Sequence, residues 1–330
     1  MRLIVLFLSL CTLLFAKLIP IDIQPADYNT SRYPKVEILD SKIVSFGRIG
    51  GEKFFGISAL AYDPETGILY MLSDRSRLFG FKLRLKGEKI ASLKPLFGTR
   101  LRDAYGHKYF VKKSDSEGMT LVKADGRKLL LISFERYPRV TAFGLSGNAR
   151  KAPVRKTLSD IRASLRLTHL PKVLQNPRHY KKRNDMLESV TYTQKYGMIT
   201  TPEKPLRKRK HDLHGIYNQE GKICDIRNNG TYAITELETL PDGNLLALER
   251  DFRLKPALNI LVRLRKIELD KKYHGICKTK TLFEATSEEG WALDNFEGVT
   301  HLHDDLYLMV SDDNDNFFQK TLLVLFRLSN

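Results

Sequence analysis

Acidic residues recur at two fixed places along this sequence, and their spacing is its clearest indication of chemistry. Four of them begin short apolar segments: Glu117, Glu188, Glu236 and Glu297. A second set ends the apolar segments that follow: Asp74, Glu135, Glu203, Glu249, Asp312 and Asp313. Carboxylates held close together repel one another unless protonation or a cation relieves the repulsion, and Ca²⁺ favours sites built of oxygen ligands. We therefore predict a Ca²⁺ site with these ligands: Glu117, Glu188, Glu236, Glu297 and Asp312.

Basic residues directly follow most of the second set of acids: Arg75, Arg136, Lys204 and Arg250. Arginine can hold a phosphate or carboxylate through two parallel hydrogen bonds, whereas lysine acts as a point charge. Arg136, Arg250 and Arg75 are therefore candidate catalytic residues for a phosphorylated substrate. One alternative stays open, in which each acid pairs with a neighbouring base and serves only to hold the fold together.

The elements that must position these residues are β-hairpins. Each copy consists of a short apolar strand, a turn and a second apolar strand that ends in charge, and the copies begin near residues 56, 117, 188, 236 and 297. Asp-Gly turns at Asp125-Gly126 and Asp242-Gly243 are typical of hairpins, because the favoured turn needs positive φ at both central residues. Third-strand candidates follow at 77–85, 140–145, 258–264 and 321–328, and fourth-strand candidates at 89–96, 221–227 and 278–283.

Four antiparallel strands that recur along the chain predict an all-β propeller of five blades, with a sixth left open in the divergent stretch. The start of the first strand and the end of the second lie at the same edge of such a blade, so the acids should converge on the channel mouth. The last copy lacks a fourth strand. We expect residues 35–46 to pair with 321–328, which would close the ring and remove the exposed strand edges.

Two regions depart from the repeat. Residues 159–187 carry apolar side chains at spacings closer to helical than to strand periodicity, which predicts a short helical insertion. Cys224 and Cys277 fall in fourth-strand candidates of neighbouring blades. Equivalent outer positions of adjacent blades diverge, and a disulfide needs Cα atoms within about 7 Å. The repeat therefore argues against a bridge between them.

The N-terminus predicts export. Met1-Arg2 and the apolar run 3–15 have the order of a signal peptide, with cleavage after Ala16 and a single domain over 17–330. An uncleaved anchor and a lipid anchor on Cys11 are the alternatives. No later apolar stretch reaches a membrane-spanning length, so we expect a periplasmic or secreted protein that is monomeric.

The formal net charge is +17, with basic runs at 181–183 and 207–211. Export argues against a nucleic-acid partner. An anionic partner fits better, either a phosphorylated small molecule or an envelope component such as a lipid headgroup or polysaccharide. A solvated basic surface without a partner is the alternative.

The same segments resemble the phytase-like family, whose domain is described as having the esterase-like activity of phytase. The resemblance rests on 57–74, Glu117-Gly118, 236–249, and the final block from Asn295 through Asn314 to Thr321. It departs at Ile57, where other copies have Glu, and in the degenerate third copy.

The resemblance implies an exported propeller that hydrolyses phosphate esters such as phytate. The mechanism would be metal-assisted, with Ca²⁺ held by the glutamates, a bound water as nucleophile, and Arg136 or Arg250 steadying the phosphate. The alternative function is a non-catalytic propeller that binds an anionic envelope ligand or a protein partner on the same face.

Overall fold

The computed structural model describes most of the chain after residue 16. The described ranges are 17–102, 107–108, 115–124, 126–145, 154–155, 170–207, 212–228, 231–254, 258–269 and 275–329. The predicted signal peptide lies outside these residues. Within them, no helix is both long enough and apolar enough to cross a lipid bilayer.

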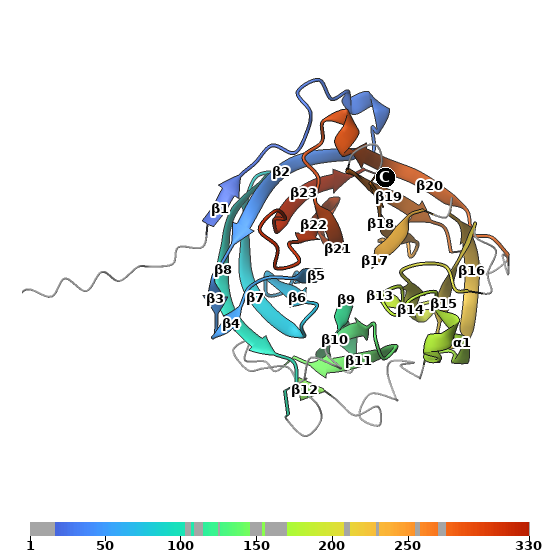
Figure 1. The fold of residues 1–330 in the computed structure, drawn as a ribbon. Helices are drawn as coiled ribbons and strands as arrows, with labels where there is room; N and C mark the ends of the chain where they lie inside the picture. The colour runs from blue at the N-terminus through green and yellow to red at the C-terminus, as the bar shows by residue number, and fades with distance from the viewer. Residues whose placement is uncertain are drawn as a thin grey trace, which may run out of the picture.

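The described strands form a ring of five blades around a central axis (Figure 1). Blade 1 consists of β5 (Ile57–Asp63), β6 (Ile68–Ser73), β7 (Arg77–Lys86) and β8 (Lys89–Arg100). Blade 2 consists of β9 (Ser116–Ala124), β10 (Arg127–Phe134), β11 (Arg139–Gly144) and β12 (Val154–Arg155). Blade 3 consists of β13 (Leu187–Thr193), β14 (Gly197–Pro202), β15 (Leu213–Asn218) and β16 (Gly221–Arg227).

Blades 4 and 5 complete the ring. Blade 4 consists of β17 (Ala233–Thr239), β18 (Leu245–Arg253), β19 (Asn259–Ile267) and β20 (Thr279–Thr286). Blade 5 consists of β21 (Asn295–His303), β22 (Leu306–Asp312), β23 (Leu322–Leu328) and two strands from the start of the chain, β2 (Val36–Ser45) and β1 (Lys17–Pro20). A small hairpin, β3 (Arg48–Ile49) and β4 (Glu52–Lys53), leads from β2 into blade 1. The prediction of a five-bladed propeller is therefore confirmed.

The ring is closed by its two ends, as the sequence predicted. β2 pairs antiparallel with β23, with Ile38 opposite Phe326 and Ile43 opposite Leu322. β1 then adds an outermost strand beside β2. Blade 5 thus joins the start and the end of the chain, and the first strands of all neighbouring blades contact one another around the axis.

The hydrophobic core is divided among the spaces between blades. The described residues form five apolar clusters, and each cluster is contributed by two neighbouring blades. Strands that are buried on both faces therefore carry apolar residues at successive positions. In β6, for example, every residue is buried. This packing fixes the inner strands and hence the residues at their ends.

The inserted segment is only slightly helical where it is described. One turn of helix, α1 (Lys172–Gln175), and one 3₁₀ turn, η4 (Pro177–His179), precede β13. Leu174 and Tyr180 anchor this segment in the cluster between blades 2 and 3. The rest of the predicted insertion, residues 159–169, lies outside the described residues.

The expectation against a disulfide is wrong. Cys224 and Cys277 are bonded, with Cα atoms 5.7 Å apart. Cys224 lies on β16, but Cys277 precedes β20 instead of belonging to it. The backbone N–H of Asp225 donates to Gly275, and that of Cys277 donates to Asp225. These bonds bring the segment before β20 across to blade 3, so the two cysteines are not at equivalent outer positions.

Candidate functional site

Three of the four predicted glutamates share one position in their blades. Glu117, Glu188 and Glu297 each lie in a β-bulge near the start of the first strand. A bulge adds a residue to one strand and re-aims its side chain. The three glutamates therefore face the same end of the ring from blades 2, 3 and 5.

Glu236 does not share this position, although the sequence placed it there. The bulge of blade 4 falls between Ile234 and Glu236, so Thr235 takes the place that glutamate has in the other three blades. Glu236 instead corresponds to Gly118 and Gly298. A Cβ added at Gly118 would lie 2.5 Å from the Glu188 carbonyl oxygen, and one added at Gly298 would lie 2.9 Å from the Ala59 Cα. The inner strands therefore approach one another closely at this position.

Glu236 extends into the centre of the ring. Its carboxyl group accepts a hydrogen bond from the backbone N–H of Leu237 at 3.1 Å and one from Met119 at 3.4 Å. Met119 belongs to blade 2, which does not neighbour blade 4, so the contact must cross the axis. Burial raises the pKa of Glu236 well above its usual range.

Each second strand, or the residue directly after it, contributes one charged residue to a ring at the mouth. Pairing places these residues at equivalent positions in blades 1 to 5: Asp74, Glu135, Glu203, Arg250 and Asp312. Four are acids, and blade 4 supplies the arginine. The sequence pattern had aligned Glu249 with these acids, but Glu249 lies one residue before the equivalent position in blade 4.

Glu249 and Asp313 make structural contacts. Glu249 is fully buried and forms ion pairs with Arg263, at 2.6 Å, and with Arg265 on the adjacent strand β19. Asp313 accepts hydrogen bonds from the Gly56 N–H at 2.9 Å and the Thr321 hydroxyl at 3.0 Å. These two acids connect strands and blades, as the alternative interpretation of the sequence proposed.

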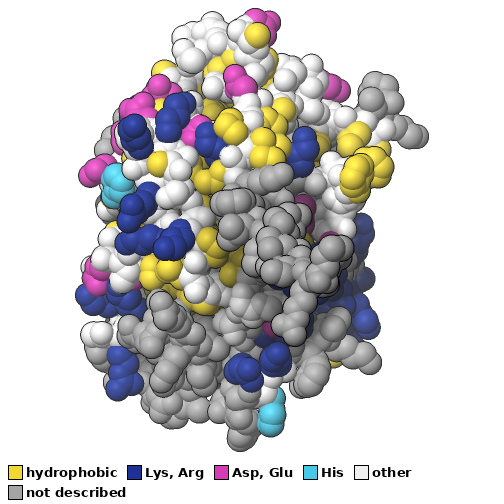
Figure 2. Space-filling view, turned by 90° about the vertical axis from the view of Figure 1, so that its left-hand side faces the viewer, with side chains coloured by type: hydrophobic (Ala, Val, Ile, Leu, Met, Phe, Trp, Pro, Cys, Tyr) yellow, Lys and Arg dark blue, Asp and Glu magenta, His cyan; other side chains and the backbone are white. Residues whose placement is uncertain are grey.

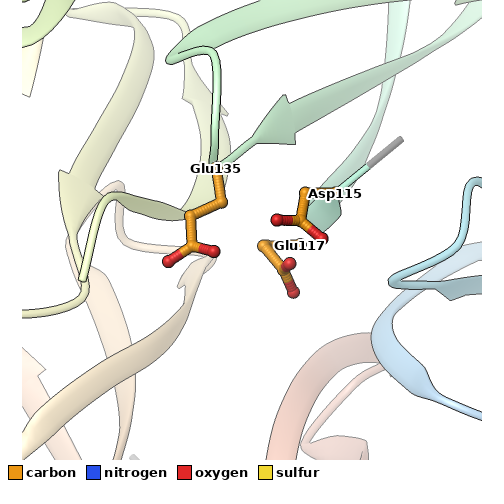
Figure 3. A group of neighbouring side chains, drawn as sticks. All are labelled: Asp115, Glu117 and Glu135. Carbon is orange, nitrogen blue, oxygen red and sulfur yellow. The ribbon is translucent and has the colours of Figure 1, made fainter. Parts of the chain in front are cut away.

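Three carboxylates of blade 2 converge closely (Figure 3). Asp115, Glu117 and Glu135 each have an oxygen within 4.8 Å of the others. Asp115 was not identified from the sequence, although it lies two residues before Glu117 and alternation in a strand places such residues on one face. The candidate Ca²⁺ ligands Glu188, Glu297 and Asp312 lie outside this close group.

Arg250 is the cation of the charged ring. Its side chain is only 15% exposed and lies 3.2 Å from Glu297 and 3.5 Å from Glu203. It also donates to the Asn295 side-chain oxygen, and Asn295 in turn donates to Glu297 at 2.7 Å. The Nε of Arg250 is buried without a hydrogen-bond partner among the described residues.

Arg75 and Arg136, the other two candidate catalytic residues, lie at the same face but are more exposed. Arg75 forms an ion pair with Asp74 at 3.1 Å, and Arg136 forms one with Asp115 at 2.5 Å. Both side chains are more than two-fifths exposed. Arg75 therefore lies beside an acid of the charged ring, and Arg136 lies beside an acid of the blade 2 group.

Burial of the acids favours their protonated forms. Desolvation, with repulsion from Glu188 and other neighbouring carboxylates, raises the pKa of Glu117 well above its usual range. For the same two kinds of reason, the pKa of Glu135 rises to about 8 and that of Asp312 to about 9. Arg250 partly offsets the effect at Glu297, whose pKa rises to about 7. A cation bound at the mouth would instead stabilise the ionised forms of these acids.

The opposite mouth of the channel has a different character. Glu238, two residues beyond Glu236, accepts a hydrogen bond from the His301 backbone N–H at 3.3 Å. It lines a pocket of about 160 Å³ together with Thr120 and Thr300. Burial raises the pKa of Glu238 to about 8. Among the described residues the dense acid group is thus confined to one mouth.

Several solved structures are distantly similar to this chain. One is the β-propeller domain of Cps50 (Swd1) from Myceliophteria thermophila, 12% identical over 89% of this chain and 92% of that one, with a TM-score of 0.39. Another is the PQQ-bound aldose sugar dehydrogenase of Streptomyces coelicolor, 11% identical over 88% and 97%, with a TM-score of 0.41. A protein of unknown function from Bacteroides caccae is 9% identical over 83% and 78%, with a TM-score of 0.39. At these values the likeness carries no inference about activity.

Sequence comparison gives a more definite result. No curated protein matches the chain. The family described as "Phytase-like: Esterase-like activity of phytase" matches residues 52–315, which run from the hairpin before blade 1 to the loop after β22. This range includes the charged ring and the three bulge glutamates. Because the match spans most of the sequence, the chain belongs to the phytase-like family.

Proposed function

We propose that this protein is a metal-assisted phosphoesterase whose active site is the acidic mouth of the channel. The observation that carries the proposal is the convergence of acids from four blades around one buried arginine, Arg250. Such a site can hold a cation and an anionic ester side by side. The family match supports phosphate-ester chemistry, and the substrate would be a phosphorylated small molecule.

The residues present fit a hard divalent cation. Asp115, Glu117 and Glu135 offer three carboxylate oxygens within 4.8 Å of one another, a donor set that suits Ca²⁺. These three residues would hold the ion, and Glu188 and Glu297 would add negative charge beside it. When bound, the ion would polarise the phosphoryl oxygen and make a water molecule more acidic.

Arg250 would bind the phosphate. Glu203, Glu297 and Asn295 hold the guanidinium in one orientation, and its exposed part would pair with an ester oxygen at the mouth. A fixed cation aimed at developing negative charge stabilises a transition state more than a mobile one does. Arg75 and Arg136, which are more exposed, would attract the anionic substrate from the rim.

A test begins with the metal content of protein purified without chelator. Hydrolysis of a phosphomonoester and of phytate is then measured with chelator and with added Ca²⁺. We expect chelation to abolish turnover and Ca²⁺ to restore it. Glu117→Gln and Glu135→Gln should each lower kcat/KM about a hundredfold, since each removes one charged ligand.

Glu65→Gln is the matched control. Glu65 lies in the turn between β5 and β6, at the other end of blade 1, and its ion pairs with Lys123 and Lys128 are at the surface. The activity of the Glu65→Gln variant should equal that of the wild type. A wild-type protein without turnover at any Ca²⁺ concentration would contradict the proposal.

One observation favours the second candidate, a propeller that binds an anionic envelope ligand without cutting it. Arg75 and Arg136 already have acidic partners, as expected if these bases mainly balance charge. On that alternative, phosphate esters would bind in a salt-dependent way without turnover. Binding measured beside hydrolysis distinguishes the two functions.

We also propose that the protein acts outside the cytoplasm. The signal-like N-terminus predicts export, and the Cys224–Cys277 disulfide supports it, because disulfides persist in oxidising compartments. Detection of the mature N-terminus by mass spectrometry would test cleavage after Ala16.

A further inference from the structure

Exposed apolar side chains gather at the face that carries the acidic mouth. Nine large apolar residues among those described are exposed, and six of them lie on or beside the connections between second and third strands. These six belong to blades 2, 4 and 5: Tyr137, Phe252, Leu254, Leu258, Phe317 and Phe318. That edge of the blades is also where Glu135, Arg250 and Asp312 lie.

The most exposed of them are two adjacent phenylalanines. Phe317 is 95% exposed and Phe318 is 86% exposed, and their rings contact edge to face with centroids 5.7 Å apart. Hydrogen bonds within the loop hold its shape, since Asn316 donates to the carbonyl of Asp313 and accepts from the Phe318 N–H. The loop therefore presents both rings to solvent instead of folding them onto the ring of blades.

Leu254 and Leu258 repeat this arrangement on the neighbouring blade. They are 76% and 60% exposed and flank the connection between β18 and β19. Leaving four large apolar side chains in water is unfavourable, because burying each would contribute about 1.5–3 kcal/mol. Exposed apolar groups of this kind mark surfaces that contact a membrane or another molecule.

Basic residues of blade 3 lie at the same face as these exposed apolar side chains. Lys181, Lys182 and Arg183 precede β13, and Lys204 and Arg207 follow β14, so all five lie at the same face. Arg207 joins the two segments by donating to the carbonyls of Tyr180, at 2.7 Å, and Lys181, at 3.0 Å. No described acid forms an ion pair with Lys181, Lys182 or Arg183.

The outer side of the ring that faces the viewer in Figure 2 does not separate apolar and basic side chains in this way. Figure 2 shows Lys and Arg side chains scattered over that side among Asp, Glu and apolar side chains. At the mouth face, by contrast, exposed apolar side chains lie on blades 2, 4 and 5, basic residues lie on blade 3, and the acids lie at the centre. A lipid interface suits this arrangement, because it takes up separate apolar side chains and attracts basic residues through anionic headgroups.

We propose that the mouth face docks on a bilayer that contains anionic lipid. Phe317, Phe318, Leu254 and Leu258 enter the interface, and the basic residues of blade 3 contact the headgroups. The formal net charge of +17 favours the same encounter. Docking brings the channel mouth to the membrane surface. The inference is independent of whether the mouth hydrolyses a phosphate ester.

Tryptophan fluorescence gives a direct test. The chain has one tryptophan, Trp291, which is 3% exposed, so a new tryptophan at the surface is easily distinguished. The emission of Phe317→Trp should shift to shorter wavelength when vesicles of phosphatidylcholine with phosphatidylglycerol are added. Leu96→Trp, on the outer strand β8, should show no shift.

Vesicle flotation measures the two contributions separately. Phe317→Ser with Phe318→Ser should weaken binding to the mixed vesicles about tenfold or more. Lys181→Ser with Lys182→Ser should weaken binding at low salt and reduce its dependence on salt. The matched controls, Ile19→Ser with Leu96→Ser and the single change Lys94→Ser, alter exposed residues of the outer strands and should bind like the wild type.

Two results would overturn the inference. One is an absence of binding to mixed vesicles at low salt by the folded wild-type protein. The other is equal binding by the double phenylalanine variant and its outer-strand control, which would leave the exposed phenylalanines as a contact for a protein partner. Binding that is equally strong on pure phosphatidylcholine would contradict the role of the basic residues.

Discussion

Blades 2 and 4 have the same backbone plan but opposite charges at the mouth. The second strand of blade 2 is followed by Glu135, whereas the equivalent residue of blade 4 is Arg250. Blade 2 has Glu117 in its bulge, whereas blade 4 has Thr235 there and carries Glu236 one residue deeper. A shift of one residue within a repeated strand thus separates an acidic side of the mouth from a side that carries the buried arginine.

The strongest way to break this asymmetry is to remove its cation. Arg250→Ala leaves Glu203 and Glu297 buried without their positive partner, so we expect the free energy of unfolding at pH 8 to fall by about 4 kcal/mol. Denaturant unfolding measures it. The control Arg253→Ala removes a side chain that is 49% exposed and should cost less than about 1 kcal/mol. A loss at Arg250 as small as that of the control would refute the assigned role.

Replacing Glu249, also in blade 4, should destabilise the protein nearly as much as replacing Arg250. Glu249→Gln weakens two buried ion pairs, with Arg263 and Arg265, and we expect a loss of about 3 kcal/mol in denaturant unfolding. The carboxylate of Glu249 pairs with these two arginines, so the variant should keep the metal content of the wild type. Loss of metal without loss of stability would place Glu249 in the ring after all.

The acids of blades 2 and 5 predict a dependence of stability on pH. The pKa of Glu135 is about 8 and that of Asp312 about 9 in the folded protein, above their usual values of 4.5 and 3.8. The folded state therefore binds more protons between these values, and the free energy of unfolding falls as pH rises from about 5 to about 9. In chelator we expect stability to fall throughout this range, by up to about 1.4 kcal/mol per pH unit for each of the two carboxyl groups.

Added Ca²⁺ should reverse that loss at the alkaline end, because it replaces protons as the counter-charge. Thermal unfolding at several pH values, with chelator and with Ca²⁺, measures both effects. Stability that rises with pH in chelator would contradict the raised pKa values. A Glu135→Gln variant should show a weaker dependence on pH than the wild type.

The smallest effect should come from Glu236→Gln. Burial raises the pKa of Glu236, which favours a neutral carboxyl group that an amide can replace in size. We expect a change below about 1 kcal/mol in unfolding free energy. A cost as large as that of Glu249→Gln would show that Glu236 is charged in the channel and would make it a candidate ligand again.

The repeat can be recognised from the residues alone, and it is sufficient to predict the propeller. Hairpin turns, apolar strands and the orphan segment 35–46 depend on local pattern, which the chain shows directly. Strand ends within one blade also share an edge by simple alternation. For these reasons the pairing of β2 with β23 and the placement of Glu117, Glu188 and Glu297 at one face could be predicted.

Residues whose position depends on register and on contacts between blades could be assigned only from the folded chain. A bulge cannot be located from residue types alone, so Glu236 and Glu249 were each placed one residue away from their true position. Asp115 precedes its strand, and its proximity to Glu135 is visible only in the folded structure. Cys277 meets Cys224 because the segment before β20 crosses to the neighbouring blade. Contacts between segments distant in sequence leave no periodic signal, because packing in three dimensions sets them.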